Sequence, residues 1–471
     1  MGKDKLSEQR SKLEEKDMIG KEAVIDPKYR IDTEENREFL RKNAEALLAF
    51  GRHFPSPGGG SYYLGDDGTP WTDRPRETWI TSRMLHVYSI GAMSGLFDEK
   101  AEECPELSPE ECRMLASRAL KGLCGELHDD LHGGWYAGIT SSGEILPGKQ
   151  CYAHAFVILG ASSAVLAGLE GAKELLEEAI STYDRYFWNE EEGLSSDTWN
   201  NEFTACDEYR GLNANMHTVE AFLAAADLFE VLGDARSHLY RKRAGRIIDH
   251  VIRWAEENDY RIPEHYSSDW KPLLSLNQEK PDDPFKPYGA TPGHGIEWAR
   301  LIGEWALSSG VSREARPGEG GGAIDVSGSV DSAEYLRHAC RLYQRAVSDA
   351  WDRDGAPGLV YTTDWDGTPV VHDRMHWTLA EAINTSAVLY RVTKEERYAE
   401  DLGMFLKYLE EKVIDPSNGS WFHQLDRENR PKGTVWPGKP DIYHAFQAML
   451  IPYADPSRSV SCGIGKNMIR S

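Results

Sequence analysis

The chain has 471 residues, of which 40% are hydrophobic and 10% aromatic. This composition predicts a globular protein with a substantial core and excludes a disordered chain. The formal net charge of −24 argues against nucleic acid or an anionic membrane as a partner.

The chain begins with a charged leader, residues 1–30, which lacks the apolar segment of a secretory signal. Six later segments rich in glycine, aromatic residues and aspartate are interpreted as β-hairpins, at 60–69, 133–145, 193–202, 261–272, 358–369 and 419–430. After each comes a stretch whose apolar residues are three and four positions apart, which predicts helices over 79–96, 152–169, 213–233, 293–308, 375–391 and 441–451.

A second, more charged set of helices alternates with the first, at 34–54, 108–128, 172–187, 235–256, 333–351 and 396–414. Small and apolar residues dominate the first set, whereas charges mark one face of the second. This contrast is typical of the inner and outer helices of two concentric rings. The sequence therefore predicts an all-α fold, an (α/α)6 barrel with short β-hairpin loops at its mouth.

One catalytic domain is expected over residues 31–455, because the repeat continues without a break. A glycine-rich insertion at 313–331 is expected to form a surface loop, and residues 456–471 a C-terminal tail. No apolar stretch reaches the ~20 residues of a membrane span. We expect a cytoplasmic protein.

Each predicted inner helix carries a histidine in its early part. The six are His86, His154, His217, His294, His376 and His444. Inner helices of such a ring run parallel, so we interpret these residues as converging on one mouth. A lone histidine on a helix is more often structural, but six in the same register favour a catalytic cluster.

Neighbouring residues support this interpretation. His294 and Glu297 are three positions apart and so share a helix face. The helix N-terminus disfavours an imidazolium and the carboxylate favours it, which could hold the pKa near neutrality. Asp441 is a good N-cap and would place His444 three residues into the last inner helix.

Two other polar positions lie on the inner helices. Asn213 and His217 are i,i+4 partners. Arg83 falls in the middle of the first inner helix, where an unpaired guanidinium would be costly. Its expected partner is either a protein carboxylate or an oxyanion that develops on a substrate.

The sequence predicts no metal and no organic cofactor. It contains no HExxH motif, no His-x-His and no Cys/His cluster, and its seven cysteines are scattered without a disulfide pattern. A metal cage built from different repeats is the alternative.

Five ordered motifs resemble the N-acylglucosamine 2-epimerase superfamily, and within it the branch of mannose isomerase and sulfoquinovose isomerase. They lie at 79–90, 213–225, 293–302, 375–383 and 438–449. The resemblance runs from about residue 33 to 454 and implies an (α/α)6 barrel, in agreement with the repeat count. It also implies a cofactor-free reaction through a cis-enediol(ate).

By this resemblance, His444 takes the proton from C2 of the sugar and returns it to C1 in an isomerase or to C2 in an epimerase. His294 assists ring opening and moves protons among the substrate oxygens. The implied substrate-binding residues are Arg83, Asn213, His217, Glu297 and Trp377.

Two departures from the family pattern bear on the substrate. Leu379 stands where many relatives carry Gln, and Pro440 stands where the sulfoquinovose branch can carry a side-chain donor. Both changes favour a neutral hexose. The Asp441-Ile-Tyr-His444-Ala segment and the Arg83 helix resemble the isomerase branch more than the epimerase branches, so the predicted activity is isomerisation between D-mannose and D-fructose. The expected partner is a free monosaccharide, and a homo-oligomer stays open.

Other function classes remain as alternatives. A sugar 2-epimerase or a sulfoquinovose isomerase would use the same residues. A glycoside hydrolase on the same fold would need two opposed carboxylates, for which Asp129, Asp130, Asp207 and Glu208 are available. A non-catalytic binding module would have no reason to keep ionisable groups at the mouth.

Overall fold

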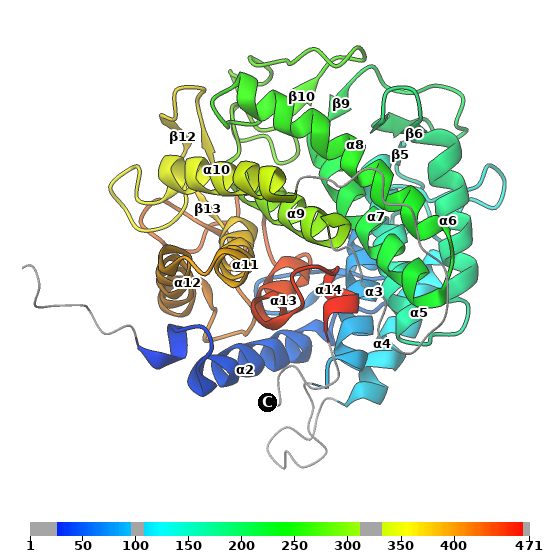
Figure 1. Ribbon diagram of the computed structural model, residues 1–471. Helices are drawn as coiled ribbons and strands as arrows, with labels where there is room; N and C mark the ends of the chain where they lie inside the picture. Colours follow the sequence, from blue (N-terminus) through cyan, green and yellow to red (C-terminus); the bar gives the residue numbers. More distant parts are fainter. Residues whose placement is uncertain (1–25, 96–107, 311–331, 465–471) are drawn as a thin grey trace, which may run out of the picture.

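In the computed structural model, which describes residues 26–95, 108–310 and 332–464, the helices form two concentric rings (Figure 1). The inner ring contains α3 (Thr78–Met93), α5 (Cys151–Leu166), α7 (Leu212–Leu232), α9 (Pro292–Gly310), α11 (His376–Thr393) and α13 (Tyr443–Leu450). The outer ring contains α2 (Glu34–Gly51), α4 (Pro109–Leu123), α6 (Ala172–Tyr186), α8 (Arg236–Glu257), α10 (Ser332–Ala350) and α12 (Glu396–Tyr408). The predicted (α/α)6 barrel is confirmed.

Burial separates the two sets of helices as their sequences predict. In α3 every residue from Thr78 to Ala92 is buried, because neighbours surround this helix. In α4 the buried side chains recur three and four positions apart, as on an amphipathic helix. Ser108 begins α4 by accepting a hydrogen bond from the Glu111 amide (3.1 Å). The core therefore fills both the ring interior and the space between the rings.

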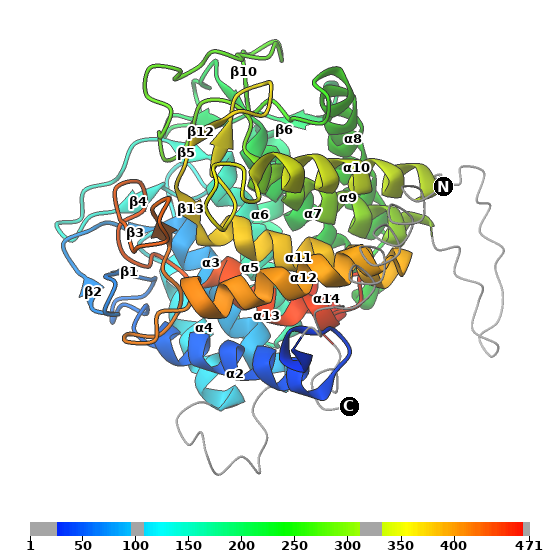
Figure 2. The same cartoon turned by 90° about the vertical axis from the view of Figure 1, so that its left-hand side faces the viewer.

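Short antiparallel strand pairs lie at one end of the helices (Figure 2). In the described chain the pairs are β1 (Tyr63–Leu64) with β2 (Pro70–Trp71), β3 (Arg76–Glu77) with β4 (Gly138–Ile139), β5 (Lys149–Gln150) with β8 (Thr198–Trp199), β6 (Trp188–Asn189) with β7 (Leu194–Ser195), β9 (Arg210–Gly211) with β10 (His265–Tyr266), β11 (Thr362–Thr363) with β12 (Pro369–Val371), and β13 (Arg374–Met375) with β14 (Gln424–Leu425).

The predicted hairpins are real but minimal. Only β1–β2 and β11–β12 form strand pairs within the turns expected for them. Four other turns close through single bridges, at Ile139–Ile145, Trp199–Cys206, Tyr266–Pro272 and Leu425–Pro431. Four of the seven strand pairs in the described chain instead join different repeats.

This pairing between repeats closes the ring. The residues just before an inner helix pair with the hairpin of the next repeat, as in β3–β4, β5–β8, β9–β10 and β13–β14. A bridge between Ala290 and Thr363 continues the series, and a bridge between Leu64 and Lys439 joins the last repeat to the first. The helix α13 contacts both α11 and α3. The N-terminal ends of the inner helices are thus held around one mouth.

Two buried lysines tie these loops in equivalent repeats. The Lys149 Nζ donates to Asp129 (2.7 Å) and to the Gly133 carbonyl (2.5 Å). The Lys439 Nζ donates to Asp415 and to the carbonyl of residue 419, both at 2.7 Å. Each lysine precedes an inner helix, so each lysine–aspartate pair holds the start of its own helix in place.

Shorter turns complete the described chain: η1 (Pro27–Tyr29), η2 (Leu409–Val413), η3 (Ile451–Tyr453) and α14 (Val460–Gly463). Tyr29 packs edge-on against Phe39 of α2, and α14 contacts α7. The glycine-rich segment predicted as a loop, 313–331, lies outside the described residues. Among the helices that are described, none combines the length and the apolar character of a membrane span.

Candidate active site

A cavity opens at the N-terminal ends of the inner helices. All seven residues that the sequence indicated line it: Arg83, Asn213, His217, His294, Glu297, Trp377 and His444. They come from five of the six inner helices. The structure thus brings the whole predicted set together.

His444, the second residue of α13, is paired with a carboxylate. Its Nδ1 lies 3.0 Å from the Glu381 Oε1 of α11. Burial lowers the pKa of His444, although the hydrogen bond to Glu381 opposes this shift. The ring is therefore neutral near pH 7 with its proton on Nδ1, and Nε2 is the nitrogen left to act as a base.

His294, the third residue of α9, also lies beside a carboxylate, although this contact lacks hydrogen-bond geometry. Its Nδ1 lies 3.0 Å from the Glu264 Oε1, and Glu264 is itself buried just before β10. The His294 ring packs against the Trp377 indole, with the ring centroids 4.8 Å apart. Glu297 shares the cavity with His294, but the carboxylate paired with the imidazole is Glu264.

Arg83 pairs with a protein carboxylate, which is one of the two partners that its sequence position left open. Its guanidinium donates to Asp441 (3.0 Å) and to the Tyr152 hydroxyl (2.7 Å). The predicted helix start is one residue off, because Ile442 is the N-cap of α13. Asp441 still supports the helix by accepting from the Tyr443 amide (2.8 Å).

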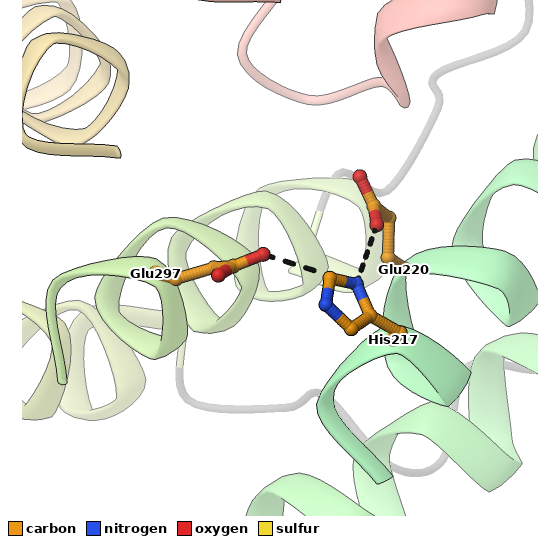
Figure 3. Close-up of side chains that lie close together, drawn as sticks. All are labelled: His217, Glu220 and Glu297. Carbon is orange, nitrogen blue, oxygen red and sulfur yellow. Dashed lines mark hydrogen bonds and ion pairs between the residues drawn. The ribbon is translucent and has the colours of Figure 1, made fainter. Parts of the chain in front are cut away.

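The His217 side chain lies between two carboxyl groups (Figure 3). Its Nδ1 is 3.1 Å from the Glu220 Oε2 and 4.0 Å from the Glu297 Oε1. Burial lowers the pKa of His217 to about 4, so the ring is neutral. The carboxylate, not Asn213, is the partner of this histidine. The Asn213 Oδ1 finds no hydrogen-bond partner in the described chain.

Glu297 differs from its acidic neighbours in protonation. Burial raises its pKa well above the usual value, and the nearby Glu381 carboxylate adds to the effect. Neither of its oxygens has a hydrogen-bond partner among the described residues. This shift favours the protonated carboxyl, which can donate a hydrogen bond into the cavity.

Arg300 supplies the positive charge beneath the cavity. Its Nε donates to Glu381 (2.9 Å), and its terminal nitrogen lies 3.8 Å from Glu220 and 3.6 Å from Glu297. The guanidinium therefore lies beside glutamate side chains that reach into the site from three different inner helices.

The same groups test whether a metal fits. Two buried sets, His217–Glu220–Glu297 and Glu297–Glu381–His444, have ligand atoms close enough to hold an ion. In both sets, however, the histidine Nδ1 is already hydrogen-bonded to a carboxylate of the same set. Arg300 already lies beside those carboxylates as a fixed cation. A fixed guanidinium beside these carboxylates disfavours a divalent ion at either set.

Comparison with known proteins identifies relatives of this chain. The family model of N-acylglucosamine 2-epimerase (GlcNAc 2-epimerase) matches residues 59–448. A D-mannose isomerase from Pseudomonas cannabina pv. alisalensis is 39% identical over 391 residues, covering 83% of this chain and 86% of the relative. The chain belongs to the N-acylglucosamine 2-epimerase family.

Other similar proteins agree with this family. A D-mannose isomerase from Thermobifida fusca is 36% identical over 422 residues, covering 88% of this chain and 94% of the relative. A crystal structure of a D-mannose isomerase superposes with a TM-score of 0.75 at 25% identity, covering 88% of this chain and 97% of the other. This member of the N-acylglucosamine 2-epimerase family is therefore an enzyme of the sugar isomerase and epimerase type.

The interpretation of six converging histidines is wrong for two of them. His86 is the ninth residue of α3, and its Nδ1 contacts the Ser163 hydroxyl (2.7 Å) inside the helix ring. The His154 Nε2 accepts from the Trp135 amide (3.1 Å), and its Nδ1 contacts the Gln150 carbonyl (2.8 Å). Both are structural, whereas His376 does line the cavity with the other three.

Sequence reasoning missed the carboxylates that hold the two proposed acid–base residues. Glu381 lies in a motif that was singled out, but its partner His444 is 63 residues away. Glu264 lies in a loop, where no periodicity indicates which way a side chain points. His423, also in a loop, lines the cavity beside His376.

The acidic residues suggested for a glycoside hydrolase do not line this family member's cavity. Asp129 is bound by Lys149 in a loop, while Asp130, Asp207 and Glu208 are exposed. They do not form the opposed pair that hydrolysis requires.

Proposed function

We propose that this protein is a metal-free aldose–ketose isomerase that interconverts D-mannose and D-fructose through a cis-enediol(ate). The observation that carries the proposal is the pair of buried histidines in one cavity, each with its Nδ1 3.0 Å from a glutamate oxygen. Relatives at 36–39% identity that are D-mannose isomerases support this choice of sugar.

His444 is the proposed base. Its neutral Nε2 takes the proton from C2 of the open-chain aldose, and the imidazolium that forms is stabilised by Glu381. The same nitrogen then returns the proton to C1 on the same face of the planar intermediate. One base is enough for isomerisation, whereas epimerisation needs proton delivery to the opposite face of C2.

His294 is the proposed acid–base residue for the substrate oxygens. Opening a pyranose requires a proton to reach the ring oxygen and another to leave the hydroxyl on C1. An imidazole whose Nδ1 faces the Glu264 carboxylate can present Nε2 to both atoms in turn. The adjacent Trp377 ring limits how far the imidazole can rotate.

An aldose C2–H is a weak acid, so the enediolate must be stabilised as it forms. The Arg83 guanidinium provides a positive charge on one side of the cavity. The protonated Glu297 carboxyl provides a hydrogen-bond donor, and Asn213 offers an amide. These groups would carry out the task that a divalent ion performs in metal-dependent isomerases.

Proton NMR of D-mannose incubated with the protein in D₂O tests this function. Fructose should appear first, with deuterium incorporated at C1, and glucose should appear late or not at all. Glucose as the main initial product would instead identify a 2-epimerase. No reaction with mannose but turnover of sulfoquinovose would overturn the choice of a neutral hexose.

A further inference from the structure

One cavity residue has no part in the chemistry described so far. His376 begins α11, lines the cavity and is only 7% exposed. Its Nε2 is buried and finds no hydrogen-bond partner among the described residues. A buried polar atom without a partner costs stability, which points to a partner that arrives with the substrate.

The contacts of His376 fix which nitrogen carries the proton. Its Nδ1 lies 3.3 Å from the backbone carbonyl oxygen of His423, and a carbonyl can only accept, so Nδ1 is the protonated nitrogen. Burial lowers the pKa of His376 to about 3, which keeps the ring neutral. Nε2 is therefore an uncharged acceptor.

The orientation of this acceptor is also fixed. The His376 ring stacks on the His423 ring with centroids 3.7 Å apart and planes 25° apart. The His376 amide donates to the same His423 carbonyl at 3.1 Å. A ring held on one face and at one edge cannot turn its Nε2 away, so the site is preorganised.

The position of His376 indicates what it contacts. Its ring centroid is 6.4 Å from that of His444, the proposed base at C2. An acceptor at this distance from the base reaches the part of a hexose beyond the reacting carbons. We propose that His376 is a specificity-determining residue that accepts a hydrogen bond from a free hydroxyl beyond C2 of the sugar. This inference rests on the proposed function.

The chemistry of the acceptor sets the class of substrate. A hydroxyl supplies the hydrogen that Nε2 needs, whereas a sulfonate or phosphate oxygen at the same place has none and would face a lone pair. A site built to accept from a hydroxyl disfavours an analogue that lacks it, because the buried acceptor then has no partner. The proposed subsite therefore selects a neutral, unmodified sugar.

The test is a cycle of protein variants and substrates. His376→Phe keeps the ring stacked on His423 but removes the acceptor, and His376→Gln places an amide oxygen near the position of Nε2. Each is assayed with D-mannose and with its 3-, 4- and 6-deoxy analogues. For mannose, His376→Phe should lower kcat/KM about tenfold, mainly through a higher KM, because this contact is made in ground and transition states alike. His376→Gln should recover part of the loss.

One deoxy analogue should discriminate between the proteins. In the wild type it should lose about tenfold in kcat/KM relative to mannose, and in His376→Phe it should lose little more, since the partner is already gone. His338→Phe, the same change on outer helix α10, should leave the whole pattern unchanged.

Two outcomes would separate the possible errors. If the wild type converts mannose but His376→Phe loses equally with mannose and with every deoxy analogue, His376 is structural and the inference fails. The same holds if His376→Phe behaves like the wild type. If the wild type does not convert mannose at all, the proposed function fails first.

Discussion

The two proposed acid–base histidines differ from the structural ones in their partners. The Nδ1 of His444 and that of His294 each face a glutamate, which favours one tautomer and stabilises the imidazolium that catalysis would create. The Nδ1 of His86 contacts a hydroxyl, and that of His154 a backbone carbonyl. A carboxylate partner inside the cavity thus distinguishes His217, His294 and His444 from the structural His86 and His154.

The first prediction concerns the base itself. His444→Ala should lower kcat by about 10²- to 10⁴-fold with the fold intact, because proton transfer from C2 loses its acceptor. His338→Ala is the control, since this histidine lies on α10 and contacts Tyr260 (2.9 Å) away from the cavity. Steady-state kinetics and circular dichroism measure both variants. More than about a tenth of the wild-type rate in His444→Ala would rule out this residue as the base.

The second prediction concerns pH. His444 must be neutral to accept a proton, and its pKa lies below the ordinary 6.5. The acid limb of the kcat/KM profile should therefore have its midpoint below pH 6.5. Activity should be lost only as the pH falls through that lowered pKa. In Glu381→Gln the hydrogen bond that raises this pKa loses its charge, so the midpoint should move lower still and kcat should fall about 10²-fold. A midpoint that stays in place would show that another group titrates.

At the scale of helices and loops, the sequence predicts which segments form inner and outer helices. It predicts less about where individual side chains lie. Periodicity separates inner from outer helices, since a helix surrounded on all sides, such as α3, has no charged face. Periodicity does not show how far along the helix axis each residue lies from the mouth. His86 therefore falls deep within α3, whereas His376 is the first residue of α11.

The pairing between loops was beyond sequence reasoning for a physical reason. Each strand is two or three residues long, which is too short for an alternating pattern. The partners also lie far apart, as with Leu64 and Lys439. Site residues recognised through family motifs lie on helices, while Glu264 and His423 lie in these loops and were missed.

The third prediction tests the buried Lys439–Asp415 ion pair in the last repeat. Lys439→Met removes a buried cation and leaves the buried Asp415 carboxylate without the positive charge that pairs with it. This should lower the free energy of unfolding by about 3 kcal/mol. Lys28→Met breaks a half-exposed pair with Glu410 (2.8 Å) and should cost no more than about 1 kcal/mol. Urea unfolding followed by tryptophan fluorescence compares the two, and equal losses would contradict a structural role for the buried ion pair.

At the scale of the whole molecule, the site exists only because the ring closes. Arg83 and Asp441 are separated by 358 positions along the chain, yet their side chains are 3.0 Å apart. The Leu64–Lys439 bridge joins the two ends of the barrel immediately beside this pair. A protein with a net charge of −24 thereby places two guanidiniums, Arg83 and Arg300, in or beneath its cavity. Local positive charge of this kind is what an enediolate requires.

The last prediction concerns metal. Five functional groups that could bind an ion, His217, Glu220, Glu297, Glu381 and His444, instead bond to one another or lie beside Arg300. A divalent ion would have to break these histidine–glutamate bonds and approach the guanidinium, which both cost free energy. Activity should therefore survive exhaustive dialysis against EDTA.

A metal-dependent sugar isomerase treated in the same way provides the positive control, and metal analysis of the dialysed protein shows that removal was complete. Activity that disappears on dialysis and returns with Mn²⁺, Mg²⁺ or Zn²⁺ would assign the enediolate's stabilisation to an ion. In that case Glu297, which belongs to both candidate ligand sets, would be the residue to substitute first. Unchanged activity leaves Arg83 and Glu297 as the groups proposed to stabilise the charge of the intermediate.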